Sequence, residues 1–283
     1  MPILKLLFLG TGGAVPRIDR RMPAVYLEDW EGHRILLDAG EGAQYSLLEN
    51  GISPASLDFV AVTHEHEDHI LGLPGLLSTA KMMGKEITVL APRRLSSYLS
   101  KSGVRVASEI ADRRLKISCI EMCHTTETCG WLLEWDVGFK LDLSKVTGFP
   151  KQALTKLIKG EPVEVNGRLI LPEEVADPGH RRFRRLLYTG DTAPCPRAWS
   201  SVGWVDVLIH EATFADDVEP ARAHEEGHST VNDAVEAARA LNASILILTH
   251  ISARYDDLEK HRRAASYNFV VIPEDGDWVF VRF

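Results

Sequence analysis

The sequence has no long apolar run, and this excludes a membrane-spanning protein. No stretch of the 283 residues approaches the ~20 apolar residues that a membrane helix needs. The apolar run at residues 1–9 ends at the Gly-Thr-Gly-Gly of residues 10–13, with no small-residue cleavage region after it. We therefore interpret residues 1–9 as a first strand and not as a signal peptide. Low-complexity segments and clear internal repeats are absent as well.

Cysteine is scarce, with only Cys119, Cys123, Cys129 and Cys195 in the chain. These four form neither a CxxC pair nor the regular spacing of a disulfide framework. The pattern predicts free thiols in a reducing, cytoplasmic compartment. An alternative role, as a zinc thiolate, exists for Cys123 because it directly precedes His124.

Basic residues are fewer than acidic ones: the chain has 32 Lys and Arg and 40 Asp and Glu, which gives a net charge of −8. This argues against a general nucleic-acid binder, because such domains are usually basic. Residues 140–185 differ: ten Lys and Arg against six Asp and Glu make this segment +4, which leaves −12 for the remainder. The segment is punctuated by Pro and Gly, and its basic residues gather at its two ends. It predicts a projecting arm at residues 144–185 with a basic face, the alternative being a solvated surface of balanced charge.

The remaining pattern is that of an α/β protein. Strands are predicted at residues 3–9, 24–28, 34–38, 58–63, 86–90, 115–120, 186–189, 205–209, 244–249, 269–272 and 278–283. Helices are predicted at residues 41–50, 72–83 and 230–241, the last with a capped start at Thr230 and Asp233. Strands outnumber helices in both halves, which indicates two packed sheets flanked by helices. We expect a single domain over residues 1–283.

The most informative segment is His-Glu-His-Glu-Asp-His at residues 64–69, between a buried-strand pattern and a helix pattern. A turn can aim several side chains at one point, whereas a continuous helix or strand spreads them over different faces. Imidazole nitrogens and carboxylate oxygens suit Zn²⁺. His64, His66, Asp68 and His69 are too many ligands for one tetrahedral site that keeps a water, so the segment predicts two metals. The alternative is a solvated acidic loop with incidental histidines.

Three further candidates each follow a buried-strand pattern, namely His124, Asp191 and His250. Alone, a histidine after a strand is more often structural than a ligand. Together with the cluster they predict two groups, which are His64, His66 and His124 for one metal, and Asp68, His69 and His250 for the other. Asp191 can bridge both. Two metals about 3.5–4 Å apart stabilise an in-line displacement at phosphorus or carbon.

The sequence motifs resemble the metallo-β-lactamase superfamily and, within it, the ribonuclease Z family of endonucleases that mature the 3′ end of precursor tRNA. Beside the metal cluster, the resemblance rests on Leu-Gly-Thr-Gly at 9–12, Asp-Ala-Gly-Glu-Gly-Ala-Gln at 38–44, Ile-Leu-Gly-Leu-Pro-Gly-Leu-Leu at 70–77, His-Glu-Ala-Thr-Phe at 210–214, Gly-His-Ser-Thr at 227–230 and Thr-His-Ile-Ser-Ala-Arg-Tyr at 249–255. It covers nearly the whole chain. It implies a four-layer αβ/βα sandwich with a projecting arm.

The resemblance also implies an activity. The chain would remove the 3′ trailer from precursor tRNA with two Zn²⁺ per chain, Mn²⁺ or another divalent metal being the alternative. Asp68 would orient the attacking water, and His228, held by Glu211, would protonate the leaving 3′ oxygen. The tRNA would keep a 3′-hydroxyl and the trailer a 5′-phosphate. RNA contacts would come from Lys151, Lys156, Lys159 and Arg254. The implied partner is precursor tRNA and not DNA or a membrane, and the implied assembly is a homodimer in the cytoplasm, one subunit's arm serving the other's site.

Two other functions stay open at this stage. A metal-dependent phosphodiesterase acting on small or cyclic diesters would share the chemistry, and the acidic total charge favours it. So does the arm, where Gln152 and Ala153 replace the Gly-Pro step of the family. A non-catalytic RNA- or protein-binding relative would keep metal only for folding, but it would have no need of a general acid. We predict a structural role for His210 and surface positions for His33, His180, His224 and His261.

Overall fold

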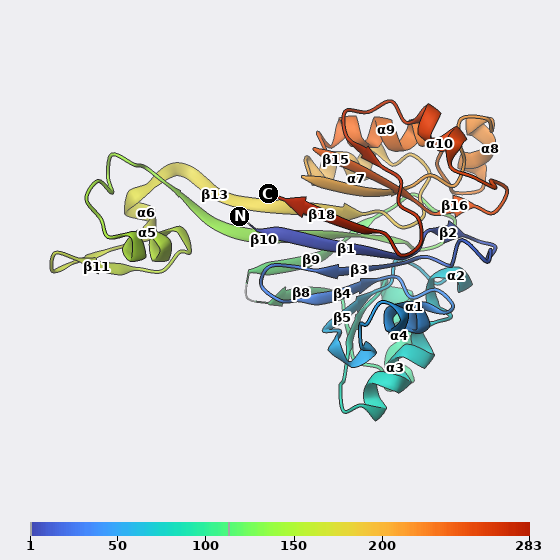
Figure 1. Ribbon diagram of the computed structural model, residues 1–283, viewed down its shortest axis with the longest axis horizontal. Coiled ribbons are helices and arrows are strands. Elements are labelled where there is room, and N and C mark those ends of the chain that lie inside the picture. The colour runs from blue at the N-terminus through green and yellow to red at the C-terminus, as the bar shows by residue number, and fades with distance from the viewer. Residues whose placement is uncertain (1, 113) are drawn as a thin grey trace.

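The computed structural model describes residues 2–112 and 114–283, whose strands form two large sheets packed face to face (Figure 1). Over these residues each large sheet has seven strands. The first sheet has the order β18 (Trp278–Arg282), β1 (Ile3–Gly10), β3 (Ala24–Glu28), β4 (Arg34–Leu37), β5 (Phe59–Ala61), β6 (Thr88–Leu90) and β7 (Val106–Ala107). The second has the order β17 (Val270–Val271), β15 (Ile245–Thr249), β14 (Val207–Glu211), β13 (Ala176–Tyr188), β10 (Cys129–Leu141), β9 (Leu115–Glu121) and β8 (Glu109–Asp112).

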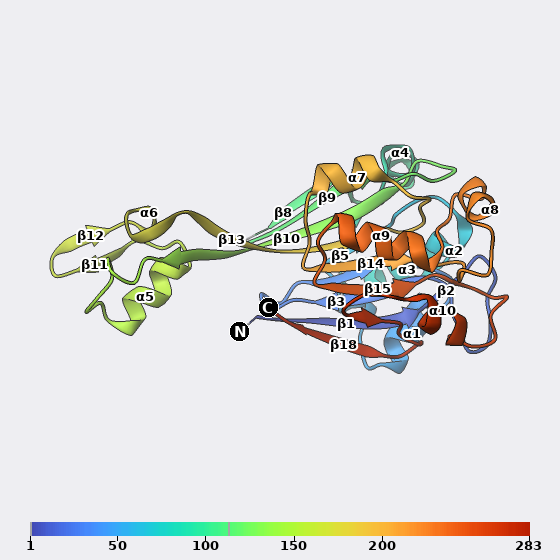
Figure 2. The ribbon, with the colours of Figure 1, turned by 90° about the horizontal axis from the view of Figure 1, so that it is seen from above.

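Helices cover the outer faces of both sheets (Figures 1 and 2). The first sheet is covered by α1 (Ala43–Glu49), α3 (Leu73–Met82) and α4 (Arg93–Lys101), with the 3₁₀ turn η1 (Pro54–Ser56) beside them. The second is covered by α7 (Pro196–Val202) and α9 (Val231–Ala240), with α8 (Pro220–Glu225) and α10 (Glu259–Ala264) nearby. The short helix α2 (Glu67–Ile70) and the small sheet of β2 (Gly12–Gly13) and β16 (Ile251–Ser252) lie at one edge of the sandwich.

Three apolar clusters fill the spaces between these layers. Side chains that alternate along the strands of both sheets meet in the centre, where Trp131 and Trp135 of β10 are fully buried. Leu47 of α1 and Leu76 of α3 pack on the outer face of the first sheet. The helices α7 and α9 pack on the outer face of the second sheet. This layering is the predicted four-layer αβ/βα sandwich, and the apolar burial of both faces explains why the central strands read as nearly continuous apolar runs.

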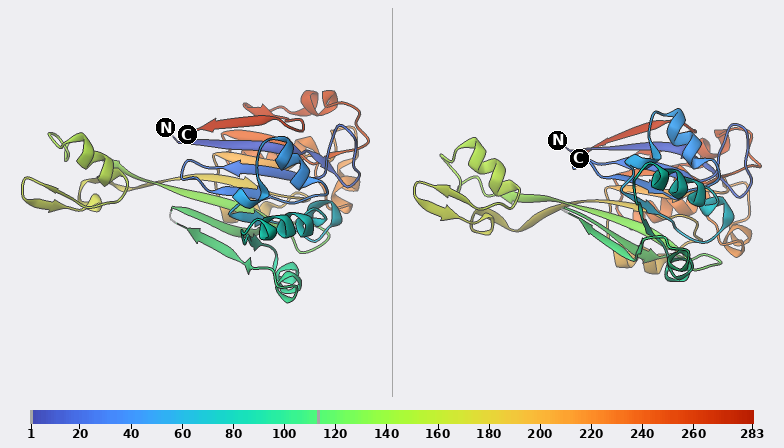
Figure 3. Two further views of the ribbon diagram at one scale, coloured as in Figure 1. Left: turned by 60° about the horizontal axis from the view of Figure 1, so that its bottom comes forward. Right: turned by 90° about the horizontal axis from the view of Figure 1, so that it is seen from below.

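A long two-stranded ribbon carries a separate lobe away from the sandwich (Figure 3). β10 and β13 stay paired from Trp131↔Tyr188 to Leu141↔Ala176. Beyond that last pair lie α5 (Lys151–Ile158), the hairpin of β11 (Val163–Val165) and β12 (Arg168–Ile170), and α6 (Pro172–Val175), which we call the arm together with their connections. The arm has a small apolar core of its own, formed by Val146, Ala153, Leu157, Val163, Ile170 and Val175. Gln152 and Ala153 lie in the first turns of α5, so a regular helix stands where the family has its Gly-Pro step.

The prediction of free thiols is wrong. Cys119 is bonded to Cys129 and Cys123 to Cys195, so all four cysteines are paired and no thiolate is left for zinc. Sequence spacing missed this because the partners meet only after β9, β10 and the segment before α7 have assembled. No helix in the described parts of the chain is long and apolar enough to cross a membrane.

The surface positions predicted for two histidines are also wrong. His33 is buried and its Nδ1 lies 2.7 Å from the Asp29 carboxylate, while His261 is fully buried against the Ala212 carbonyl. His224 is partly exposed and pairs with Asp233. The side chain of His180 lies outside the described ones.

Candidate metal centre

Several strands of the two sheets end at the same edge of the sandwich. β4 and β5 run parallel in the first sheet, as do β13, β14 and β15 in the second, and pairing through β10 gives β9 the same direction as β13. Ligand sites commonly form at the carboxyl ends of parallel strands, where the following loops meet. The polar residues that end or follow these strands are Asp38, His64, His124, Asp191, Glu211 and His250.

The turn after β5 contributes four side chains to this edge. β5 ends at Ala61, His66 caps the amino end of α2, and Asp68 and His69 lie in the first turn of that helix. His64 and His69 are fully buried, whereas His66 and Asp68 are partly exposed.

The first group of side chains consists of His64, His66, His124 and Asp191, whose ligand atoms all lie within 4.8 Å of one another. His66 Nδ1 is 2.9 Å from His64 Nε2 and 3.2 Å from His124 Nε2. Ligands at ~2.0–2.1 Å from a tetrahedral Zn²⁺ are separated from each other by roughly 3.3 Å. The spacing of these nitrogen atoms therefore fits a single ion.

The second group consists of Asp68, His69, Asp191 and His250, again within 4.8 Å. Oδ1 of Asp191 lies 3.3 Å from His69 Nε2 and 3.2 Å from His250 Nε2. Its other oxygen, Oδ2, lies 3.8 Å from His64 Nε2 in the first group. Asp191 thus directs one oxygen at each group, which is the geometry of a bridging carboxylate.

Buried polar atoms in the second group have no hydrogen-bond partner among the described residues. They are His69 Nε2, His250 Nε2 and Asp191 Oδ1. Leaving such atoms unsatisfied is costly, and a divalent cation between them would satisfy all three. Two glycines make room for the rings, since a Cβ on Gly13 would overlap His250 and a Cβ on Gly227 would come within 2.7 Å of His124. The donor set and its surroundings fit a divalent metal.

A second layer of groups fixes the orientation of the candidate ligands. His69 Nδ1 donates to Asp38 Oδ2 at 2.8 Å, His124 Nδ1 donates to the Gly227 carbonyl at 2.8 Å, and His250 Nδ1 lies 2.8 Å from Thr213 Oγ1. With Nδ1 engaged in this way, Nε2 is left as the metal-binding atom. Asp68 is held by the backbone N–H of Ala14 at 2.8 Å. Sequence reasoning missed Asp38, although it begins the motif at residues 38–44.

The electrostatics favour the metal-binding protonation states of His64, His124 and Asp191, whereas His69 is favoured in its protonated form. Burial, with the nearby His69, lowers the pKa of His64 to about 2, and burial also lowers the pKa of His124. Burial would raise the pKa of Asp191, but His250 and His69 hold it well below its usual range. Burial alone would lower the pKa of His69, but the carboxylates of Asp191 and Asp38 raise it well above the ordinary value. This concentration of negative charge also attracts a divalent cation, which would replace the His69 proton.

Glu211 and His228 form a pair beside the two groups. His228 Nδ1 lies 3.0 Å from Glu211 Oε1 and 3.9 Å from Asp191 Oδ2. Burial alone would lower the pKa of His228, but the Glu211 carboxylate raises it to about 9. Glu211 is buried and also accepts hydrogen bonds from Thr192 and Thr213, so its oxygens are already engaged. Glu211, His228 and His250 are close enough to hold a metal ion. The hydrogen bonds to Glu211 instead favour an ion pair between Glu211 and protonated His228.

The four residues predicted to contact RNA lie in two places. Lys151, Lys156 and Lys159 are exposed on and just after α5 in the arm, at the opposite end of the molecule from α2 (Figure 1). The guanidinium of Arg254, in contrast, lies 4.9 Å from the centre of the Phe214 ring, and that ring packs edge-on against His228. Arg254 is therefore near the candidate metal centre, and the three lysines are remote from it.

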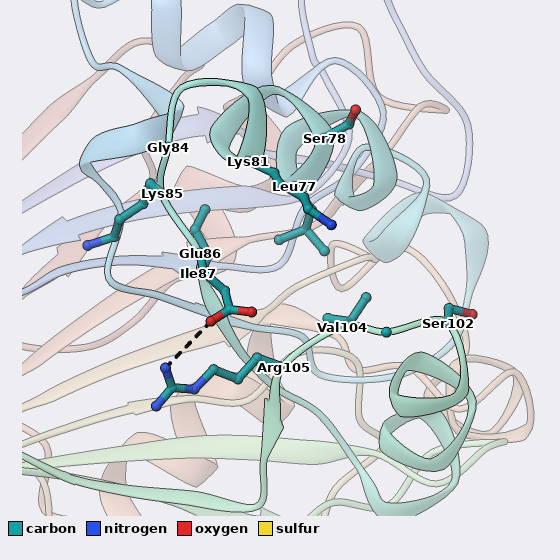
Figure 4. Close-up of a pocket in the computed structure, with 11 residues that line it drawn as sticks. Leu77, Ser78, Lys81, Gly84, Lys85, Glu86, Ile87, Ser102, Val104 and Arg105 are labelled. Atoms are coloured by element: carbon teal, nitrogen blue, oxygen red, sulfur yellow. Dashed lines mark ion pairs between the residues drawn. The ribbon is translucent and has the colours of Figure 1, made fainter.

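A separate pocket of about 460 Å³ lies between the carboxyl ends of α3 and α4 (Figure 4). Leu77, Ile87 and Val104 form its apolar wall, and the ion pair of Glu86 with Arg105 lies at its rim. It contains none of the candidate ligands and has no part in the site described above.

Comparisons with known proteins agree with this geometry. A family profile described as the Beta-lactamase superfamily domain matches residues 33–251. The chain is 66% identical over 286 residues to Ribonuclease Z of Pyrobaculum calidifontis, with both chains covered in full. It is 34% identical over 297 residues to Ribonuclease Z of Saccharolobus solfataricus, covering 99% of this chain and 100% of the relative. The structure of the short form of human tRNase Z has a TM-score of 0.67 at 22% identity, covering 97% of this chain and 98% of that one, which shows a shared fold.

These likenesses extend over the sandwich and the arm alike, because the Pyrobaculum relative aligns along the whole chain. The motifs that carry the resemblance in sequence lie around one cluster of histidines and carboxylates at the edge of the sandwich. The chain belongs to the ribonuclease Z family of the β-lactamase superfamily.

Proposed function

We propose that this protein is a zinc-dependent endoribonuclease that removes the 3′ trailer from precursor tRNA, leaving a 3′-hydroxyl on the tRNA and a 5′-phosphate on the trailer. The observation that carries the proposal is the Glu211–His228 pair, 3.0 Å apart and adjoining two groups of metal-type ligands. A binding protein that kept metal only for folding would not need an acid at this place. Membership of the ribonuclease Z family supports the same conclusion.

Seven residues are proposed to hold two Zn²⁺ ions. His64, His66 and His124 would bind one, Asp68, His69 and His250 the other, and Asp191 both. When bound, the metal ions activate water and offset the negative charge of the phosphodiester. Asp68 would also accept a hydrogen bond from the attacking water; its Oδ2 lies 3.4 Å from His250 Nε2 and 2.8 Å from the Ala14 N–H.

His228 would deliver a proton to the leaving 3′ oxygen. An alkoxide is a poor leaving group, and a positioned acid lowers the barrier to its departure. Glu211 accepts a hydrogen bond from His228 Nδ1 and favours the protonated imidazole, so Nε2 of His228 would be the nitrogen that donates the proton. Thr192 and Thr213 hold the carboxylate of Glu211 in turn.

The arm is proposed to bind the body of the tRNA, away from the chemistry. Lys151, Lys156 and Lys159 are exposed on it, and phosphate contacts of this kind supply affinity without reading sequence. Arg254 is proposed to contact RNA next to the metal centre, where its charge would meet a phosphate near His228.

A homodimer in the cytoplasm is proposed as the working form, with the arm of one subunit reaching the substrate of the other. Disulfides persist in intracellular proteins of hyperthermophiles, so the two disulfides are compatible with this compartment.

The direct test incubates zinc-loaded protein with a precursor tRNA that carries a 3′ extension and maps both new ends. We expect one cut near the 3′ end of the mature tRNA, with the end groups given above, and no cut after chelation of the metal. Hydrolysis of a small or cyclic phosphodiester with no cleavage of the precursor would instead indicate a phosphodiesterase of small substrates.

A further inference from the structure

All four cysteines of the chain lie around one candidate ligand, His124. The Cys119–Cys129 disulfide closes the segment that contains His124, linking β9 to the start of β10. The Cys123–Cys195 disulfide joins the residue directly before His124 to the residue that caps α7. His124 is therefore held by one covalent link that joins the two sides of its loop and by a second that runs across to the segment after Asp191.

His124 lies near the edge of its sheet, where fewer strands flank it than flank the cluster at residues 64–69 or Asp191. That cluster and Asp191 follow β5 and β13, each of which has at least two strands on either side. β9 is separated from the edge of its sheet only by the short β8, as β15 before His250 is by β17, and residues 122–128 form an irregular loop. Apart from the disulfides, Cys123 packs against the apolar cluster of α7 and α9, and the His124 ring contacts the rings of His64, His66 and His228. A few hydrogen bonds add to these contacts. They run from Ala193 N–H to the Cys123 carbonyl at 2.7 Å, from Cys123 N–H to Thr192 Oγ1, and from His124 Nδ1 to the Gly227 carbonyl.

The Cys123–Cys195 disulfide can be reached from solvent. A cleft of about 710 Å³ is lined by Cys123 and His124 together with Thr126, Glu127 and Arg197. Cys195 is fully buried, so a reductant would approach from the Cys123 side. The cleft thus joins the disulfide to the first group of metal-type ligands.

We propose that the two disulfides are positioning elements for His124, and that the affinity of the first group for its metal depends on their redox state. This inference rests on the proposed metal ligation by His124. For each disulfide, a dithiol reductant gives up two electrons and two protons, the S–S bond breaks to give two thiols, and the reductant becomes a disulfide. The freed loop then samples positions in which His124 Nε2 is away from His66 Nδ1. Groups that orient a metal ligand are typically worth about 10- to 100-fold in metal affinity.

The test measures Zn²⁺ binding by competition with a chromophoric chelator. Oxidised wild-type protein is compared with the Cys123→Ala/Cys195→Ala and Cys119→Ala/Cys129→Ala variants and with wild-type protein reduced by a dithiol, desalted without air. We expect two tight equivalents in the oxidised protein. One equivalent should weaken by about 10- to 100-fold in each double variant and in the reduced protein, while the other keeps its affinity. His124→Ala should lose the same equivalent, and reduction of His124→Ala should add nothing more, since the two changes act through one residue.

A thiol titration in denaturant comes first, and four free thiols in the air-exposed native protein would overturn the proposal. So would two equal, unchanged affinities after reduction, because the disulfides would then support stability alone. If either double variant does not fold, the reduced wild-type protein, which has the native sequence, decides the question. Absence of Zn²⁺ binding in oxidised wild-type protein would instead contradict the proposed function itself.

Discussion

Asp38 is fully buried behind His69 and accepts hydrogen bonds from three side chains, those of His69, Thr63 and Tyr188. Replacing it by Asn keeps the shape but removes the negative charge that holds the His69 Nδ1–H. We expect Asp38→Asn to weaken one Zn²⁺ equivalent by about 10- to 100-fold, which metal analysis after dialysis against a graded chelator would detect. Tyr188→Phe is the matched control, because it removes a different donor from the same carboxylate. An equal loss in both variants would argue for general loosening and against a specific role in orienting His69.

His228 is proposed to act on protons and not on metal. His228→Ala should lower kcat for precursor tRNA by about 10²–10⁴, the usual effect of a positioned acid. Metal content should be unchanged. His224→Ala is the control, since this histidine pairs with Asp233 outside the two metal groups. Loss of a metal equivalent from His228→Ala would show that it is a ligand and that the mechanism is wrong.

Glu211 sets the pH range in which His228 is protonated. Burial would lower the pKa of His228, but the carboxylate raises it to about 9. The protonated form is therefore present below this pH, and kcat should fall as the pH rises through about 9. Glu211→Gln removes the largest influence that raises the pKa of His228, so the alkaline limb of the kcat profile should move to lower pH. The Glu211→Gln/His228→Ala double variant should cost much less than the product of the single losses. An unshifted limb would separate Glu211 from the proton transfer.

The sequence identified the residues of the site by type and position, but not their neighbours. Histidines and aspartates after strand patterns are recognisable along the chain, and the structure brings all seven together. The candidate ligands are supported by a carbonyl at Gly227, a hydroxyl at Thr213 and a carboxylate at Asp38, which are groups that every protein has in abundance. The role of these supporting groups can be recognised only from their contacts in the folded protein. The cysteines were misjudged for the same reason.

At the scale of elements, local patterns predicted most strands of the sandwich, but they missed β7, β8, β10 and the part of β13 before residue 186. Ala24–Glu28 matches the prediction residue for residue, and Thr230 caps α9 with Asp233 in a reciprocal capping box. The strand Cys129–Leu141 was not predicted. Its outer half and the first part of β13 leave the sandwich, so they lack the alternating burial on which the prediction relied.

A buried carboxylate joins the two sheets at the end away from the metal centre. Asp29 lies between β3 and β4 and accepts hydrogen bonds at 2.7 Å from the Trp135 indole of β10 and from His33. We expect Asp29→Ala to lower the free energy of unfolding by about 3 kcal/mol, because it leaves buried donors without a partner. Urea denaturation would measure this. Asp112→Asn, which changes the half-exposed carboxylate on the other side of His33, should cost less than about 1 kcal/mol.

The pH dependence of this link has a defined sign. Burial would raise the pKa of Asp29, but hydrogen bonds from His33 and Trp135 bring it below the ordinary value of 3.8. Its contribution to stability is then complete above that value and is lost as the pH falls through the lower folded-state pKa. The stability difference between wild-type protein and Asp29→Ala should therefore shrink only in acid. A constant difference at all pH values would mean that packing, and not the charge, is responsible.

At the scale of the whole molecule, the candidate metal centre and the arm proposed to bind RNA lie far apart. The candidate ligands, Glu211 and His228 lie at one edge of the sandwich, and the arm projects from the opposite end (Figure 2). The arm has its own apolar core, and the ribbon of β10 and β13 is its only continuous strand connection to the rest of the described chain. The charge and the Pro and Gly content of residues 140–185 predicted a projecting segment, because both features can be recognised without any knowledge of tertiary contacts.

Deletion of the arm tests this division of labour. Leu141 pairs with Ala176, so residues 142–175 can be removed and the ribbon closed with an Asn-Gly turn without disturbing the last strand pair. Hydrolysis of a small chromogenic phosphodiester and the Zn²⁺ content should survive, since no proposed chemical residue is removed. Cleavage of precursor tRNA by the deletion protein should fall by orders of magnitude through a higher KM. The affinity of the wild-type protein for precursor tRNA should fall steeply as the salt concentration rises. The residual affinity of the deletion protein should depend less on salt. Changing Lys151, Lys156 and Lys159 together to Gln is the milder companion and should reproduce part of the loss without shortening the chain. Equal losses on both substrates would show that the arm supports the sandwich, and an undiminished rate on precursor tRNA would show that the RNA is bound elsewhere.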